Sequence, residues 1–127
     1  MMPKQFTDFA LAAALSMGIA GAAAAQECTM PTKPDVPDGA DATEEEMVGA
    51  INDVRTFQEE VGAYRECLDA EMSALKARFA QAKGEKKKAL GKEFDALTEK
   101  YNESVAKEKE LASTVNAQIG IWKANNE

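Results

Sequence analysis

Apolar residues recur with the spacing of an α-helix from about residue 43 onward. One row repeats every seven residues, and it comprises Met47, Val54, Val61, Leu68, Leu75 and Ala82. A second row comprises Ala50, Ile51, Phe57, Tyr64, Met72 and Phe79. Steps of three and four residues place both rows on one helical face. The second row shifts by one position at Met72, as expected for a straight helix with 3.6 residues per turn. The pattern predicts a helix over about 43–82.

A second apolar stripe predicts another helix over about 87–123. Its members are Leu90, Phe94, Leu97, Tyr101, Val105, Ala112, Val115, Ile119 and Trp122. Between the stripes, Gly84 can adopt the left-handed conformation that ends helices, and Lys83 suits a helix C-terminus. We therefore expect a turn at about 83–86. One continuous helix is the alternative, since Phe79 and Leu90 would share a face. We favour the hairpin because helices much longer than 25 residues are unusual in small domains.

Residues 26–42 form a proline-rich leader that cannot be helical. Pro31, Pro34 and Pro37 recur every three residues, and Asp38-Gly39 follows them. This pattern is typical of polyproline II or extended chain ending in a turn. The next residues, Thr43 to Glu46, match a Thr-x-x-Glu capping box with acidic residues on the first helical turn. The first helix is predicted to begin there.

Residues 1–25 read as a secretory signal peptide. Lys4 is followed by a run without charged residues over 9–25, and Ala23-Ala24-Ala25 precedes Gln26 as a cleavage site. A membrane anchor is the alternative, but the run is short for a span. We expect an exported, periplasmic protein that is soluble after cleavage. The domain organisation is then a signal peptide over 1–25, a leader over 26–42 and a helical hairpin over 43–127.

Cys28 and Cys67 are the two cysteines, and in an oxidising compartment such a pair favours a disulfide. An intermolecular bridge or a redox switch is the alternative. Cys67 lies about 36 Å along the first helix from its start, whereas residues 28–42 can span about 46 Å as polyproline II. A bridge within one chain therefore requires the leader to run back along the first helix as a strap. Met30 and Val36 would supply its apolar contacts.

Composition excludes several classes of function. The chain has 15 Lys and Arg against 22 Asp and Glu, a net charge of −7 and no histidine. An acidic balance argues against nucleic-acid binding, which needs basic side chains for phosphate. The absence of histidine removes the Ser-His-Asp arrangement and the common zinc ligand sets. We expect no enzyme activity, no cofactor and no metal.

The charges are distributed unevenly along the predicted hairpin. Basic residues gather at the turn, namely Lys83, Lys86, Lys87, Lys88 and Lys92. Glu44 to Glu46 and Glu127 would lie at the opposite end. A solvated turn is the ordinary explanation of such a cluster. The functional one is contact with an acidic partner or, with weaker support, with the anionic head groups of a membrane surface.

Short motifs across the chain resemble a family of small exported bacterial helical proteins of unknown function. They are Cys28-x-x-Pro31-x-x-Pro34-x-x-Pro37-Asp38-Gly39, Ala42-Thr43 with Glu46-Met47, Tyr64-x-x-Cys67-Leu68, Tyr101-Asn102-x-Ser104-Val105, and Asn116-x-Gln118. The resemblance implies a periplasmic setting and pairing of Cys28 with Cys67. It carries no known activity, so it assigns no catalytic residue.

The expected fold is all-α, with two long antiparallel helices and an extended N-terminal strap held by one disulfide. Such a hairpin leaves helix surface uncovered, so a homodimeric four-helix bundle or an envelope partner is expected. The expected function is that of a structural or interaction protein of the cell envelope. The alternatives are a holdase-like periplasmic chaperone and a carrier of small apolar ligands between the helices, with Tyr64, Tyr101 and Trp122 as its stacking residues.

Overall fold

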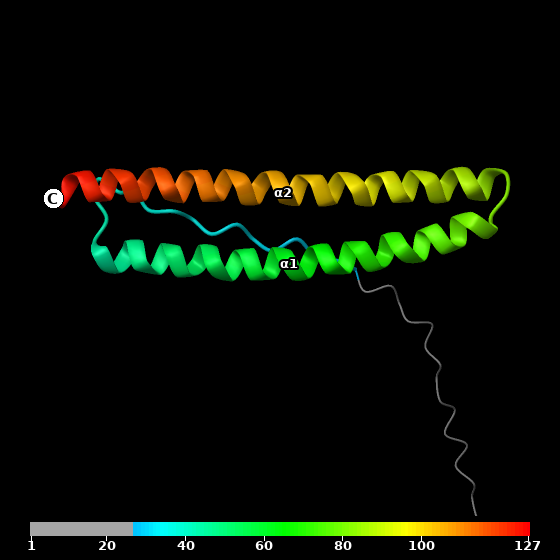
Figure 1. Cartoon of the computed structure of the whole chain (residues 1–127), viewed down its shortest axis with the longest axis horizontal. Coiled ribbons are helices and arrows are strands. Elements are labelled where there is room, and N and C mark those ends of the chain that lie inside the picture. Colours follow the sequence, from blue (N-terminus) through cyan, green and yellow to red (C-terminus); the bar gives the residue numbers. More distant parts are fainter. Residues whose placement is uncertain (1–26) are drawn as a thin grey trace, which may run out of the picture.

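The computed structural model describes residues 27–127, which form a helical hairpin. Helix α1 (Glu44–Gln81) and helix α2 (Glu85–Asn125) lie antiparallel and pack against each other (Figure 1). This arrangement confirms the all-α hairpin and excludes the continuous helix. The predicted signal peptide, residues 1–25, lies outside the described residues. No helix within residues 27–127 is long and apolar enough to cross a membrane.

The turn between the helices is shorter than expected, because Gly84 is the residue directly before α2 rather than part of a longer loop. Its φ of 62° lies in the region that glycine adopts without strain. Helix α1 ends as the Ala82 N–H donates to the Phe79 carbonyl over 3.2 Å. Helix α2 therefore begins at Glu85, and it continues to Asn125 instead of ending near residue 123.

The start of α1 has the predicted capping box. The Thr43 N–H donates to the Glu46 carboxylate over 2.8 Å, and the Glu46 N–H donates to Thr43 Oγ1 over 3.2 Å. These reciprocal bonds satisfy two backbone donors that a helix terminus would otherwise leave unpaired. Local sequence therefore determines where α1 begins.

The core follows the two stripes and divides into two clusters. One cluster lies toward the start of α1 and the end of α2, and it comprises Val54, Phe57, Val61, Leu111 and Val115. The other cluster lies nearer the turn, and it comprises Tyr64, Leu68, Leu75, Leu90 and Leu97.

The apolar pattern predicted two wrong residues for the buried row of α2. Leu111 is 2% exposed and Ser104 is fully buried, whereas Val105 and Ala112 are only half-buried. The innermost row of α2 thus repeats every seven residues and includes a serine. On α1, Phe79 is 39% exposed although it continues the apolar row.

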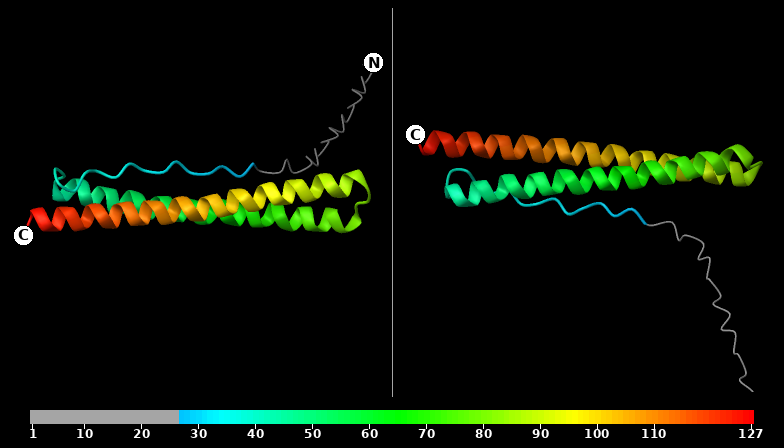
Figure 2. Two further views of the ribbon diagram at one scale, coloured as in Figure 1. Left: turned by 90° about the horizontal axis from the view of Figure 1, so that it is seen from above. Right: turned by 60° about the horizontal axis from the view of Figure 1, so that its bottom comes forward.

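The strap, residues 28–39, lies along the groove between the helices and runs antiparallel to α1 (Figures 1 and 2). Its first residue, Cys28, is disulfide-bonded to Cys67 across 39 positions of sequence, with 5.7 Å between their Cα atoms. The predicted bridge within one chain and the predicted path of the leader are both confirmed.

Burial along the strap has a period of three residues, as expected for polyproline II. Met30 and Val36 pack against the core, as predicted, and the Lys33 ammonium lies 3.7 Å from the Glu110 carboxylate on α2. The row that points to solvent comprises Thr29, Thr32, Asp35 and Asp38. An extended chain that keeps one of its three rows of side chains in solvent therefore fits between these helices.

Gly39 fixes the other end of the strap. Its N–H donates to Gln118 Oε1 over 2.8 Å. A Cβ at this position would overlap the Gln118 carbonyl oxygen and would lie 2.9 Å from the backbone nitrogen of Trp122. Gly39 is therefore required for close approach to the α2 backbone, and the strap is anchored at both ends.

Removal of the disulfide is expected to destabilise the fold strongly. Closing a loop of this length contributes about 4 kcal/mol in the chain-entropy treatment. The Cys28→Ser, Cys67→Ser variant should lose about that amount of unfolding free energy in urea titrations, and reductant should not affect it further. A loss below about 1 kcal/mol would contradict the stabilising role of the loop closure.

Gly39 and Gly49 should respond in opposite directions to alanine. Gly39→Ala must displace the strap from α2 and should cost about 1–3 kcal/mol. Gly49→Ala adds a Cβ that meets nothing within 4 Å. Inside a helix, it should raise stability by about 0.5–1 kcal/mol. Equal effects of the two substitutions in thermal unfolding would contradict the close-approach argument.

Candidate functional site

The five predicted lysines lie together at the closed end of the hairpin. Here residues 75–95 are called the tip, and the opposite end, with the strap, is called the base. Lys83 is in the turn and the others lie in the first two turns of α2, all exposed. The tip has seven Lys and Arg against three Asp and Glu, whereas the rest of residues 27–127 has seven against eighteen. The molecule is therefore electrically bipolar.

The lysines occupy an unfavourable place on α2. A helix N-terminus carries a partial positive charge, so each cation there costs a few tenths of a kcal/mol to about 1 kcal/mol. The N-cap, Gly84, has no side chain to accept a hydrogen bond, and Glu85 is the acidic residue of the first turn. Helix stability therefore does not explain the sequence Lys86-Lys87-Lys88.

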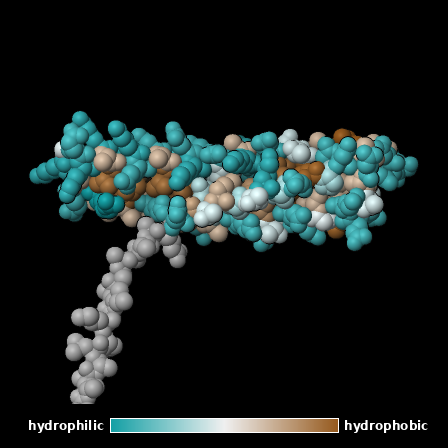
Figure 3. All heavy atoms as spheres, turned by 180° about the vertical axis from the view of Figure 1, so that it is seen from behind, coloured by the Kyte–Doolittle hydropathy of each residue, from teal (hydrophilic) through white to brown (hydrophobic). Residues whose placement is uncertain are grey.

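A groove between the helices continues beyond the strap toward the tip. We call it the strap-face groove. Leu75, Leu90 and Leu97 form its floor, with cavities of about 350 and 630 Å³. Alanine side chains form its walls, namely Ala74, Ala77, Ala82, Ala89 and Ala96. Charged side chains form its rims, namely Glu71, Arg78, Lys86, Glu93 and Lys100. Figure 3, which shows the side with the strap, has apolar surface exposed near the tip.

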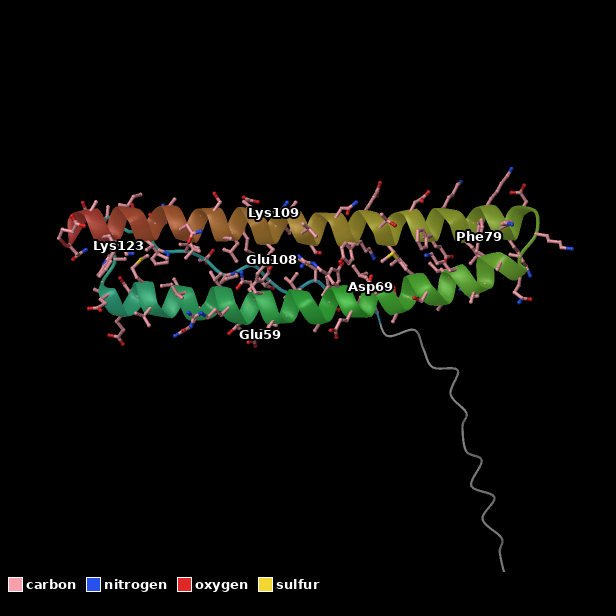
Figure 4. All side chains as sticks on the ribbon, viewed as in Figure 1. Glu59, Asp69, Phe79, Glu108, Lys109 and Lys123 are labelled. Atoms are coloured by element: carbon pink, nitrogen blue, oxygen red, sulfur yellow. A yellow bond between two sulfur atoms is a disulfide. The ribbon has the colours of Figure 1, made fainter. Side chains whose placement is uncertain are left out.

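A second groove, of about 360 Å³, lies at the tip on the opposite face. Its floor contains Phe79 and Phe94, and Figure 4 shows where Phe79 lies near the turn. The Lys87 ammonium is 4.7 Å from the centre of the Phe79 ring, and the Lys76 ammonium is 5.9 Å from that of Phe94. Lysines over aromatic faces make cation–π contacts and cover the rings with their methylene stems. The chain's own side chains therefore partly close this groove.

The three aromatic residues expected to stack on a ligand lie elsewhere. Tyr64 is 7% exposed in the core, and Tyr101 is half-buried with the Arg65 guanidinium 5.9 Å from its ring centre. Trp122 lies at the base, where its indole N–H is buried without a hydrogen-bond partner among the described residues. None of the three lines a tip groove. Phe79 and Phe94 do, although the sequence pattern marked them only as core positions.

A polar layer between the two core clusters was not predicted. Arg65 Nε donates to Ser104 Oγ over 3.0 Å, and the Arg65 guanidinium pairs with the Glu108 carboxylate, which Figure 4 shows between the helices. Ser104 in turn donates to the Tyr101 carbonyl over 2.6 Å. The signal was Ser104 itself, a polar residue in the seven-residue row that contains Leu97 and Leu111. Such a layer favours one register of the helices, because sliding would separate its partners.

The region around the disulfide contains one set of potential metal donors. Cys28, Cys67 and Glu71 offer atoms within 4.8 Å of one another. The two sulfurs are bonded to each other, however, and metals bind thiolates. In the oxidised protein this set does not form a metal site.

The fold raises the pKa of the Tyr64 hydroxyl. Burial raises the pKa of its hydroxyl above 10.0, and the Glu103 carboxylate raises it further, while Lys107 acts in the opposite direction. A raised pKa means that the folded protein retains this proton at a pH where the unfolded chain loses it.

A scan of protein-family models, a search of curated proteins and a search of solved structures each found no match to this chain. The resemblance to the exported bacterial family therefore stays a prediction. The site must be interpreted from its own geometry.

Arg65 and Glu108 should be energetically coupled. Their side chains are 21% and 27% exposed, so a double-mutant cycle with alanine should yield about 1–3 kcal/mol. The Lys107–Glu103 pair, which joins at 3.0 Å but is 43% and 63% exposed, is the matched control and should yield at most about 0.5 kcal/mol. Equal coupling in the two pairs would contradict a specific role for the polar layer.

Stability should decrease as the pH rises above 10. The neutral form of Tyr64 is favoured by folding, so its contribution is complete below pH 10 and is lost as the pH rises through the raised pKa. Urea titrations of the protein and of Tyr64→Phe between pH 8 and 11 test this. The variant should show a shallower decline, and parallel curves would exclude the effect.

Proposed function

We propose that the protein is an exported interaction module of the cell envelope, in which the strapped base is a rigid support and the tip binds a partner protein. The observation that carries the proposal is the asymmetry of the hairpin. From the Cys28–Cys67 disulfide to Gly39 the strap covers one face of the hairpin at the base, whereas no segment of residues 27–127 covers the groove that continues on that face at the tip. We assign it no catalytic role.

Two features support a binding tip over a merely solvated one. The lysines at the start of α2 stand where the helix dipole disfavours cations. They also flank apolar surface, and cations beside an apolar groove favour partners that are acidic and partly apolar. Departures from local sequence preference are concentrated at functional sites.

Export is supported by the predicted signal peptide and by the disulfide. Disulfides persist in oxidising compartments and are rare in the reducing cytosol. The proposed compartment is the periplasm, and the protein is proposed to be soluble after cleavage.

Photo-crosslinking in the producing cells tests the proposal. A photoreactive amino acid replaces Gln81 at the tip or, as the matched control, Gln58 at the base; both side chains are exposed and line surface grooves. The tip position should yield a discrete adduct and the base position should not. An adduct of twice the chain mass would identify a second copy as the partner.

Charge reversal completes the experiment. Lys86→Glu with Lys88→Glu should reduce the tip adduct at least fivefold. The same variant should be no less stable than the native chain, because acidic residues suit a helix N-terminus. Absence of any tip-specific adduct, or an adduct insensitive to charge reversal, would overturn the proposed function.

A further inference from the structure

We propose that the strap-face groove at the tip binds an extended segment of a partner, acidic overall and with apolar residues separated, as in the strap, by multiples of three positions. The inference rests on the proposed function and specifies the chemistry of the partner. It comes from the strap, which shows what kind of chain fits between α1 and α2 on this face.

The strap and the empty groove are two parts of one channel. The strap enters it at Cys28, beside Cys67, and follows it to the base. On the other side of Cys67 the same two helices continue to form its floor, through Leu75, Leu90 and Leu97. Met30 bridges both core clusters, so the strap already contacts the cluster that also forms the floor of the empty part. The docking surface is thus continuous with an interface present in the protein.

The dimensions of the empty groove suit a short extended segment. From Glu71 to Ala82 the groove follows α1 for about 17 Å, which corresponds to five or six residues of polyproline II. Its walls at Ala74 and Ala96 are small side chains exposed to solvent. Small walls leave space for inward apolar side chains, the role that Met30 and Val36 have in the strap. A preformed extended chain also loses little conformational entropy on binding.

The charges around the groove favour an acidic segment. Arg78, Lys86 and Lys100 line it beside Glu71 and Glu93, and none of the three basic side chains has an ion-pair partner among residues 27–127. The remaining tip lysines add to the positive potential. At one position of the strapped half the arrangement is the opposite, since the Lys33 ammonium of the strap lies 3.7 Å from the Glu110 carboxylate of α2. The occupant of the tip should therefore carry acidic residues where the strap carries Lys33.

The strap sequence itself supplies the probe. A fluorescent synthetic peptide covers residues 29–38 with Lys33→Glu, which preserves the three-residue spacing and increases the negative charge. It is titrated into the oxidised protein, residues 26–127, and binding is followed by fluorescence anisotropy. A peptide of the same composition with the apolar residues moved off the spacing should bind at least tenfold more weakly.

Two matched variants locate the binding. Ala96→Phe fills the groove, whereas Ala106→Phe places the same ring at another exposed position of α2 outside it. The first should weaken peptide binding at least tenfold and the second less than twofold. Lack of binding at millimolar peptide, or equal effects of the two variants, would overturn the inference.

The outcomes also separate this inference from the proposed function. Tip-specific crosslinking without peptide binding would leave the interaction module standing and reject the extended segment. Peptide binding without crosslinking would keep the groove chemistry and reject the cellular function. If sedimentation shows a dimer that Ala96→Phe dissociates, the groove is occupied by a second copy and the extended-segment inference is wrong.

Discussion

The structure depends on the covalent attachment of an extended strap to the middle of α1. Two helices in a hairpin bury one apolar stripe each. The groove between them on each face of the hairpin stays open, so a chain of this size has little core. The strap fills one groove at the base, where Met30 and Val36 join the core. An extended segment without helical hydrogen bonds has no stability of its own, and small folds commonly need such a covalent link. The Cys28–Cys67 bond holds it in place, and Gly39 fixes its other end against α2.

This attachment divides the hairpin into two halves that differ in structure. At the base, the core is covered by the strap, and the adjacent Arg65–Ser104–Glu108 layer favours one register of the helices. At the tip, packing depends on fewer buried residues, and apolar surface adjoins a concentration of cations. The two halves therefore differ in how much apolar surface they leave to solvent between the helices on the strap face.

The strap also shows how one groove can accept a polyproline-like chain. Its three-residue periodicity turns apolar residues such as Met30 and Val36 toward the helices and keeps polar residues such as Thr32 and Asp35 in solvent. The groove beyond it has the same helices, a leucine floor and smaller walls. The proposed binding of a partner segment would use the physical principles by which the strap binds, in a second part of the same channel.

The sequence by itself determined the helices, the capped start of α1 and the clustering of lysines at the turn, and it fixed the path of the strap once the disulfide lies within one chain. These features follow from local periodicity, from the conformational preferences of proline and glycine and from chain length. None of these depends on which side chains pack together in the folded protein. Only the tertiary structure decided which residues occupy the centre of the interface, where Leu111 and Ser104 replace the expected Val105 and Ala112. It also decided that Arg65 reaches Glu108, that Gly39 meets the Gln118 backbone and that the tip groove stays open. Each of these depends on the rotation and register of one helix against the other, and a small rotation exchanges a buried residue for its exposed neighbour.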